Sequence, residues 1–240
     1  MTVLGRERQL GAVVLDVEQA ALRATHHLLS LDFHPVGIVC TRAFRFGREA
    51  DIRGYRQALA LEGKSDQEHI INCFEGEDDT PVRSEPQSEP FDITMNPRYD
   101  RFVKGAFDAV SNRIREGKLP RGLYIADEFF AIGALRAIRQ AGLRIPDDVA
   151  VVSHQSSSNW NFELGGITAM RFDAYACGVR AGHFIVEVAE GKRSPDDQLL
   201  IEASLVKGAS CGEQHADTSS GLPGWMPVDG KTMKTQFEGV

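Results

Sequence analysis

The sequence predicts an α/β protein with a parallel sheet flanked by helices. Short apolar runs of strand length alternate with longer segments in which apolar residues recur every three or four positions. Repeated strand and helix cycles of this kind are typical of a parallel sheet with helices on its faces. With 42% hydrophobic residues over 240 positions, the chain can bury a substantial core.

The first third of the chain predicts three strands and two helices. They are a strand over 11–15, a helix over 17–28, a strand over 36–40, a helix over 52–63 and a strand over 69–74. Asp16 stands where its side chain can accept N–H bonds from the first helix. Pro35 stops any continuation of that helix, and Gly63 ends the second one.

The rest of the chain continues the alternation. Residues 75–90 carry acids, serines and prolines without an apolar period and predict a surface excursion. There follow a helix beginning at Asn96-Pro97, a strand over 123–126, a helix over 128–141 stopped by Gly142, a strand over 149–152, a loop over 153–161, a strand over 167–170, a helix over 173–190 and one final strand over 199–206. Residues 212–240 have little apolar pattern and predict a disordered tail.

Composition and missing motifs narrow the function. The 34 acidic residues outnumber the 27 basic ones, which disfavours stand-alone binding to nucleic acid. The four cysteines are widely spaced and predict free thiols. Phosphate-binding loops, GxSxG and HExxH motifs do not occur, so no catalytic residue, metal site or cofactor is predicted. No apolar stretch approaches a membrane span or a signal peptide, and the predicted location is cytoplasmic.

One long segment resembles a known family. Residues 123–138 read LYIADEFFAIGALRAI, and RQAGLRIPDDVAVV continues to residue 152. The segment is similar to the sensor domain of the lac repressor (LacI/GalR) family, with its A-N-D-x-x-A-x-G-A-L pattern, glycine turn and I/V-P-x-D-V strand. Weaker matches at 20–38, 53–59 and 167–173 extend the resemblance to residues 10–211. Small Gly133 and Ala134 predict close packing of their helix on the sheet.

The resemblance implies a fold and a division into lobes. The fold is the periplasmic-binding-protein-like type I α/β fold, with a second lobe at about 42–165 and 198–207 and remnants of a first lobe at about 10–41 and 166–195. The helix-turn-helix and most of the family's first lobe do not precede Leu10. We therefore expect a truncated reading frame, or a chain that associates with itself to cover exposed strand edges.

The resemblance also implies what the chain does and which residues do it. A non-enzymatic sensor would bind a small effector, act as a homodimer, and reach DNA only through a helix-turn-helix that this chain lacks. The effector-contacting positions are Asp51, Asp127, Glu128, Gln155 and Phe172, where the family usually has Arg, Asn, Asp, Asp and Gln. Because an arginine has become an acid at Asp51, a neutral or cationic sugar-like effector is favoured over an acidic one.

Each candidate also has a purely structural interpretation. Asp127 and Glu128 are suited to capping the helix that follows them. Asp51 is suited to a solvated first turn. Gln155 could be a loop residue and Phe172 a core residue.

Two other functions stay open at this stage. A periplasmic sugar-binding protein would have the same architecture but would need an export signal. An enzyme could use Asp127, Glu128 and His154 as an acid/base cluster at the strand ends. The sequence offers no nucleophile or metal set to accompany that cluster.

Overall fold

The computed structural model describes residues 12–41, 45–74, 97–156 and 166–212. The strands are β1 (Ala12–Leu15), β2 (Val36–Cys40), β3 (His69–Asn72), β4 (Gly122–Ile125), β5 (Ala150–Ser156), β6 (Thr168–Phe172), β7 (Gln198–Ile201) and β8 (Ser204–Val206). The helices are α1 (Val17–Ser30), α2 (Arg45–Leu61), α3 (Pro97–Arg115), α4 (Glu128–Gln140) and α5 (Ala174–Ala189), and a 3-10 turn covers Ala209–Cys211. The predicted α/β class is confirmed. The surface excursion and the tail lie outside the described residues.

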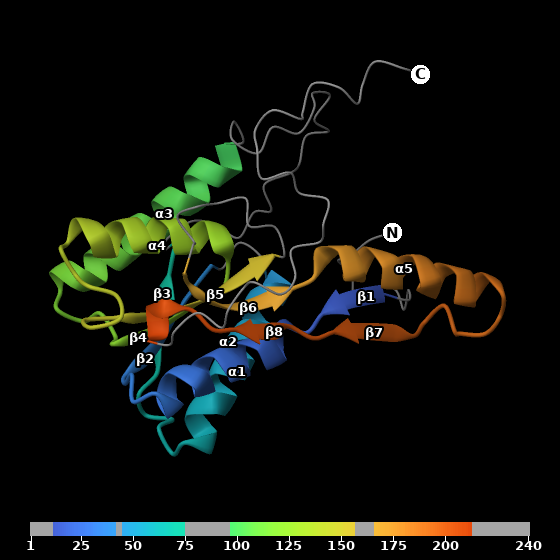
Figure 1. Ribbon diagram of the computed structural model, residues 1–240, viewed down its shortest axis with the longest axis horizontal. Helices are drawn as coiled ribbons and strands as arrows, with labels where there is room; N and C mark the ends of the chain where they lie inside the picture. The colour runs from blue at the N-terminus through green and yellow to red at the C-terminus, as the bar shows by residue number, and fades with distance from the viewer. Residues whose placement is uncertain (1–11, 42–44, 75–96, 157–165, 213–240) are drawn as a thin grey trace.

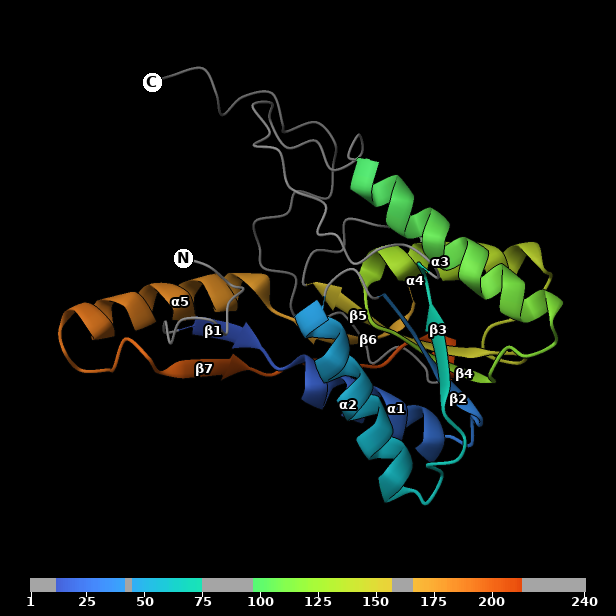
Figure 2. The same ribbon diagram turned by 180° about the vertical axis from the view of Figure 1, so that it is seen from behind.

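Two sheets of unequal size organise these elements (Figure 1). The larger has the order β3-β2-β4-β5-β6-β8 and is parallel except for β8, which runs antiparallel to β6. The smaller pairs β1 with β7 in parallel. Helix α5 lies beside the smaller sheet, and this unit projects from one side of the larger sheet in both views (Figure 2).

Helices cover both faces of the larger sheet. Helices α1 and α2 pack together on one face, and α3 and α4 pack together on the other. Alternate residues of the central strand β4 divide between these faces: Tyr124 packs with α1 and α2, whereas Leu123 and Ile125 face α3 and α4. Burial on both sides explains why β4 is a nearly continuous apolar run in the sequence.

Two glycines let each helix pair approach closely. A Cβ on Gly54 of α2 would lie 2.0 Å from the carbonyl oxygen of Glu18 on α1. A Cβ on Gly133 of α4 would lie 2.1 Å from the carbonyl oxygen of Val103 on α3. The prediction that Gly133 packs on the sheet is therefore wrong, because its close contact is with the neighbouring helix. The sequence pattern identifies a tight contact but not its partner.

Local signals fix where several helices begin and end. Asp16 accepts a 3.0 Å hydrogen bond from the backbone N–H of Gln19, which confirms it as the cap of α1. Asp173 caps α5 in the same way through Ala176, at 2.9 Å. Gly142 follows α4 with a φ of +73°, a left-handed conformation that glycine adopts without steric cost.

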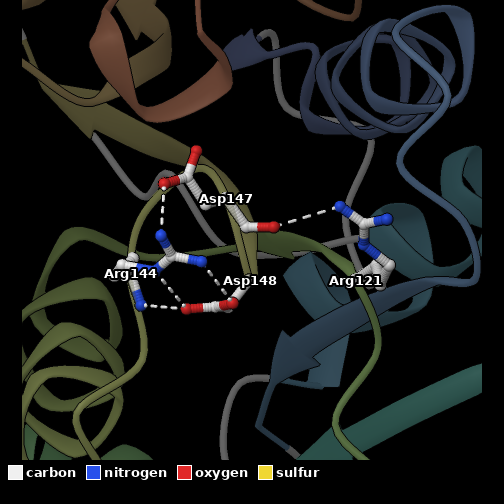
Figure 3. Close-up of polar contacts among 4 residues, drawn as sticks. All are labelled: Arg121, Arg144, Asp147 and Asp148. Carbon is white, nitrogen blue, oxygen red and sulfur yellow. Dashed lines mark hydrogen bonds and ion pairs between the residues drawn. The ribbon is translucent and has the colours of Figure 1, made fainter.

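A polar cluster closes the turn from α4 into β5 (Figure 3). The Arg144 guanidinium bonds to both carboxylate oxygens of Asp148, at 3.1 and 3.2 Å, and forms an ion pair with Asp147. Arg121, just before β4, donates to the carbonyl oxygen of Asp147 at 3.1 Å. These exposed contacts join the amino ends of β4 and β5, so they lie at the edge of the sheet opposite the strands' carboxyl ends.

The expected division of strands between two lobes needs correction. Strand β2 was predicted to belong to a first-lobe remnant, but it pairs with β3 and β4 near the centre of the larger sheet. Strand β6 was predicted to belong to that remnant too, but it pairs with β5. Apolar periodicity shows that a segment is a buried strand but not which sheet it joins, since pairing partners are distant in sequence.

The predicted final strand over 199–206 is two strands in different sheets. β7 pairs with β1, and β8 pairs with β6. The interruption falls at Glu202 and Ala203, where the chain passes from the smaller to the larger sheet. The loop predicted over 153–161 is also wrong in part, because β5 continues to Ser156; residues 157–161 lie outside the described residues.

Two hydrogen bonds brace the junction between the sheets. The chain crosses there three times, after β1, after β6 and between β7 and β8. The backbone N–H of Asp16 donates to the carbonyl oxygen of Ile201 at 2.9 Å. Arg23 on α1 donates to the carbonyl oxygen of Ala203 at 2.8 Å. The first bond ties two crossing segments together, and the second ties the crossing between β7 and β8 to α1.

We expect Gly54→Ala to destabilise the protein, because the added methyl would force α1 and α2 apart. Overpacking of a close contact costs roughly 1–3 kcal/mol. The matched control is Gly178→Ala in α5, where a Cβ would meet no heavy atom within 4 Å; removing a glycine from a helix interior there should stabilise by about 0.5–1 kcal/mol. Thermal unfolding of both variants measures the difference. Equal transition temperatures would contradict the close packing of α1 on α2.

Candidate functional site

Polar side chains gather at the carboxyl ends of the parallel strands. Asp127 follows β4, Gln155 lies near the end of β5, and Phe172 ends β6. Asp51 reaches the same edge from α2, because it bonds to Tyr124 of β4. In open α/β sheets this edge is where ligands bind.

Asp51 is buried and not solvated. Its side chain is 6% exposed, and the Tyr124 hydroxyl donates to its Oδ1 at 3.0 Å. It is the seventh residue of α2, so the prediction of a solvated first-turn residue is wrong. The sequence did not reveal this position of Asp51 in the helix, because α2 begins at Arg45, seven residues before the apolar period from which the helix was predicted.

Burial makes Asp51 a neutral acid near pH 7. Loss of solvent raises its pKa to about 8, and the nearby Asp127 carboxylate adds to that rise, while the bond from Tyr124 opposes it. The pKa of Tyr124 is itself raised well above its usual value by burial. At neutral pH the Asp51–Tyr124 pair therefore carries no net charge, and the protonated carboxyl of Asp51 has an O–H donor of its own, while the Tyr124 hydroxyl proton is used within the pair.

Asp127 caps α4, as one of its two interpretations predicted. Its carboxylate accepts from the backbone N–H groups of Phe129 at 2.7 Å and Phe130 at 3.4 Å. Burial and the neighbouring Glu128 raise its pKa to about 6, against the lowering effect of those bonds. Glu128 lies in the first turn of α4 and is half-buried. Capping does not use every lone pair of the carboxylate, so Asp127 also has acceptor capacity at the strand ends.

Phe172 lies in the core. It is 2% exposed and packs in the cluster beneath α1 and α2. The His154 ring lies 4.8 Å from it, centroid to centroid, and burial lowers the pKa of His154 to about 4. His154 is thus neutral at pH 7 and directed at an aromatic ring, whereas Asp127 is directed at the backbone of α4. This arrangement does not favour the acid/base cluster considered for an enzyme.

Gln155 lies on the other face of the sheet. It is 7% exposed, and its Nε2 is buried without a hydrogen-bond partner. The structure thus brings Asp127 close enough to Asp51 to raise the pKa of the Asp51 carboxyl. In the described part of the chain, Gln155 and Phe172 form no hydrogen bond with this pair.

Two polar residues of the edge escaped the sequence analysis. Tyr124 is the only polar side chain in the apolar strand β4, and a hydroxyl in such a strand needs a partner when buried. Arg171 is the charged residue of β6, where the burial of its neighbours is otherwise almost complete. A polar residue inside an apolar strand, next to the strand's carboxyl end, is the signal that would have identified both.

Two hollows lie near the larger sheet. One of about 340 Å³ runs between β3 and α3, and is lined by residues such as Asn72, Arg101 and Asn112, away from the predicted positions. The other, of about 650 Å³, lies at the junction of the sheets, and its lining includes Arg171 and Ser204. The first hollow adjoins the carboxyl end of β3 and the second that of β6. The second is the one next to a predicted position, because Arg171 in its lining precedes Phe172.

The described part of the chain has neither a cluster of metal-ligating side chains nor a helix that could span a membrane. No group of three or more His, Cys, Asp or Glu residues there could hold a metal ion. The helices of that part are each too short or too polar to cross a bilayer. The four cysteines are free thiols, three of them buried.

Residues 25–211 match the family model of the periplasmic binding protein-like domain, which is most of the chain, so the chain belongs to this family. Within it, the chain is a LacI/GalR-family effector-binding domain, as the sequence resemblance implied.

Three relatives illustrate the similarity. The HTH-type transcriptional repressor MelR of Bacillus subtilis (strain 168) is 23% identical over 204 residues, which are 84% of this chain and 53% of that protein. A LacI family transcriptional regulator from Enterococcus faecium, with bound ribose, superposes with a TM-score of 0.62 and 16% identity, covering 85% of this chain and 66% of that one. The lac repressor dimer bound to operator and the anti-inducer ONPF gives a TM-score of 0.66 and 16% identity, covering 86% and 62%. This chain spans about half the length of its curated relative MelR.

We expect the pH dependence of stability above pH 6.5 to be set largely by Asp51. The folded chain keeps a proton on this carboxyl between its usual pKa of 3.8 and its folded value of about 8, whereas the unfolded chain has lost it. The free energy of unfolding therefore falls as the pH rises through that window and levels off above the folded pKa. Asp51→Asn should flatten the fall in transition temperature between about pH 6.5 and 8.5.

Between about pH 6.5 and 8.5, the other titratable groups at the same edge of the sheet contribute little to the pH dependence of stability. His154 has a lowered pKa of about 4, so its effect has the opposite sign and ends near pH 6.5. The pKa of Asp127 is about 6, so its contribution is nearly complete there, and Tyr124 does not ionise in this range. Identical slopes for the wild type and Asp51→Asn would show that Asp51 is ionised in the folded protein.

Proposed function

We propose that this chain is the effector-sensing portion of a LacI-family transcription regulator and binds a small neutral, sugar-like molecule. The carrying observation is the carboxyl edge of the larger sheet, where polar side chains lie at the ends of neighbouring strands: Asp51 and Asp127 beside the end of β4, and Gln155 near the end of β5. The relatives are transcriptional repressors, not enzymes, and one solved neighbour holds ribose. We also propose that the chain is located in the cytoplasm, because these relatives are transcriptional repressors.

The protonation state of Asp51 bears on the charge that the proposed effector should carry. From the sequence, the acid at Asp51 favoured neutral or cationic molecules over anionic ones. Because Asp51 is protonated near pH 7, it provides hydrogen bonds without a fixed negative charge. Neutral hydroxyl-bearing molecules suit such a group better than cations, which gain little from an uncharged acid.

Effector binding would act on DNA by shifting the arrangement of the two sheets. The polar edge adjoins the junction, where three crossing segments connect the sheets. A molecule that binds one arrangement more tightly than another shifts the population toward it. The helix-turn-helix that would read DNA is not recognised in this chain, so its coupling to the sensor belongs to the proposal.

Thermal-shift titration with neutral monosaccharides and disaccharides tests the proposed function. A molecule that binds only the folded state raises the transition temperature by mass action. We expect a saturable rise with one neutral sugar and none with sugar phosphates. A cooperative transition that no sugar moves would contradict the proposal.

Asp127→Asn separates ligand contact from helix capping. Asparagine caps a helix about as well as aspartate, so the variant should keep its transition temperature. A carboxylate that accepts bonds from sugar hydroxyls is replaced by a weaker, neutral acceptor, and we expect affinity to fall about tenfold, the equivalent of one charge-assisted hydrogen bond. Unchanged affinity in calorimetric titration would leave Asp127 as a cap alone.

Self-association is a further part of the proposed function. The unit formed by α5, β1 and β7 exposes large apolar side chains, namely Tyr175, Val179, Ile185, Val186 and Leu200. Apolar patches of this kind commonly mark protein interfaces. A homodimer would cover them, in keeping with the solved lac repressor dimer.

We expect Val186→Glu to shift the chain toward monomer in sedimentation analysis, because a carboxylate in a buried interface loses its hydration. Val186 is 54% exposed on α5. Leu61→Glu is the matched control, since Leu61 is 68% exposed at the end of α2, on the larger unit. Equal effects of the two substitutions would place the interface elsewhere.

A further inference from the structure

Unsatisfied polar atoms of the sheet concentrate at its carboxyl edge. In the described part of the chain, the buried strand-borne side-chain atoms without a hydrogen-bond partner are Asn72 Oδ1, His154 Nδ1, Gln155 Nε2 and Arg171 Nε. Each lies within the last three residues of its strand. Folded proteins pair nearly all buried polar groups, so a group left open in one region calls for an explanation such as a missing ligand.

Two of these atoms lie side by side. Gln155 of β5 and Arg171 of β6 are register partners in the parallel ladder. Val151, four residues before Gln155, packs in the cluster beneath α3 and α4, and so does Ile167, four residues before Arg171. Because side chains alternate between faces, Gln155 and Arg171 both point to the α3–α4 face of the sheet. Paired positions on one face hold Cβ atoms about 5 Å apart.

Both open atoms are hydrogen-bond donors. The Nε of an arginine always carries a proton, and the Nε2 of glutamine is an amide nitrogen. The described residues provide no ion pair for Arg171, although Asp173 lies two residues away along the chain. Two adjacent donors without an acceptor create a place for oxygen atoms from outside the chain.

Space for such oxygen atoms lies next to Arg171. Arg171, but not Gln155, lines the hollow of about 650 Å³ at the junction of the sheets, and the rest of the lining includes Arg180, Ser204 and the acids Asp173 and Glu202. This volume lies within the range of small-molecule pockets, about 300–1,000 Å³. The hollow is bounded on one side by β6 and on another by the start of α5, so its occupant would contact both units.

We propose that Gln155 and Arg171 form a donor pair that binds neighbouring hydroxyl oxygens of the sugar-like effector at the sheet junction. The inference rests on the proposed function. The resemblance already gave Gln155 as an effector position, and the inference adds Arg171 and the polarity of the contact. The family resemblance places an arginine at the position of Asp51, on α2. In this chain the cationic donor is instead on β6, and the Asp51–Tyr124 pair supplies uncharged polar groups from the opposite face.

This placement predicts the orientation of the bound molecule. Hydroxyl oxygens that accept hydrogen bonds would lie over β5 and β6, and hydroxyls that donate would lie toward Asp127 after β4. A planar guanidinium presents donors that suit two adjacent oxygens, which a lysine ammonium does not match. Arg171→Lys should therefore weaken binding almost as much as removal of the charge.

Calorimetric titration tests the donor pair with D-ribose, D-galactose and cellobiose as probes. For the probe that binds the wild type, we expect Arg171→Met and Gln155→Met each to weaken affinity at least tenfold. Arg139→Met is the matched control: Arg139 is exposed in the last turn of α4, away from the carboxyl edge of the sheet, and lines neither hollow, so its replacement should change affinity less than twofold. Monodeoxy derivatives of the same sugar identify the hydroxyl that Arg171 binds. The derivative that lacks this hydroxyl should bind the wild type more weakly than the parent sugar does, but should bind Arg171→Met as well as the parent sugar does.

The outcomes separate this inference from the proposed function. Binding to the wild type with unchanged affinity in Arg171→Met overturns the donor pair and leaves the sensor function standing. A clear drop in the ligand-free transition temperature of Gln155→Met overturns it as well, because the amide would then have an acceptor within the protein. Failure of every sugar to bind the wild type contradicts the proposed function and removes the donor pair with it.

Discussion

Parallel pairing of β2, β4, β5 and β6 in a single register brings four carboxyl ends to one edge of the larger sheet, and the candidate site exists only because of it. This pairing depends on the helix pairs on both faces, which bury most residues of these strands. Gly54 and Gly133 allow the two helices of each pair to pack backbone to backbone, and α2 reaches β4 through the bond between Asp51 and Tyr124. Packing of apolar residues and positioning of polar ones are thus consequences of the same arrangement.

The polar edge is arranged in two chemically different halves. On the α1–α2 face, burial keeps Asp51 protonated and His154 neutral, so charge is suppressed. On the α3–α4 face, Gln155 and Arg171 leave donors open beside a hollow. A neutral polyol can satisfy both halves, since its hydroxyls donate and accept. A strongly charged molecule would meet only one of them.

Most of the fold could be predicted from the sequence, because each helix and strand carries its own apolar period and several carry caps such as Asp16. The sheet to which a strand belongs could not be predicted, because the sequences of β2, β6 and β7 are compatible with a buried strand in either lobe. The site was predicted less well. The family resemblance identified Asp127, and its capping role could be predicted because an acid between a strand and a helix is a local pattern. The burial of Asp51 and the pairing of Gln155 with Arg171 depend on contacts between elements far apart in sequence, which no local pattern reports.

Hydrogen–deuterium exchange with and without a neutral sugar tests most directly whether the carboxyl edge of the larger sheet is the sensing site. The account predicts that the sugar slows exchange at the ends of β4, β5 and β6 and at the crossing segment around Glu202, while the turn held by Arg144 and Asp148 at the opposite edge is unchanged. Protection confined to the hollow between β3 and α3, with none at the ends of β4 to β6, would contradict it.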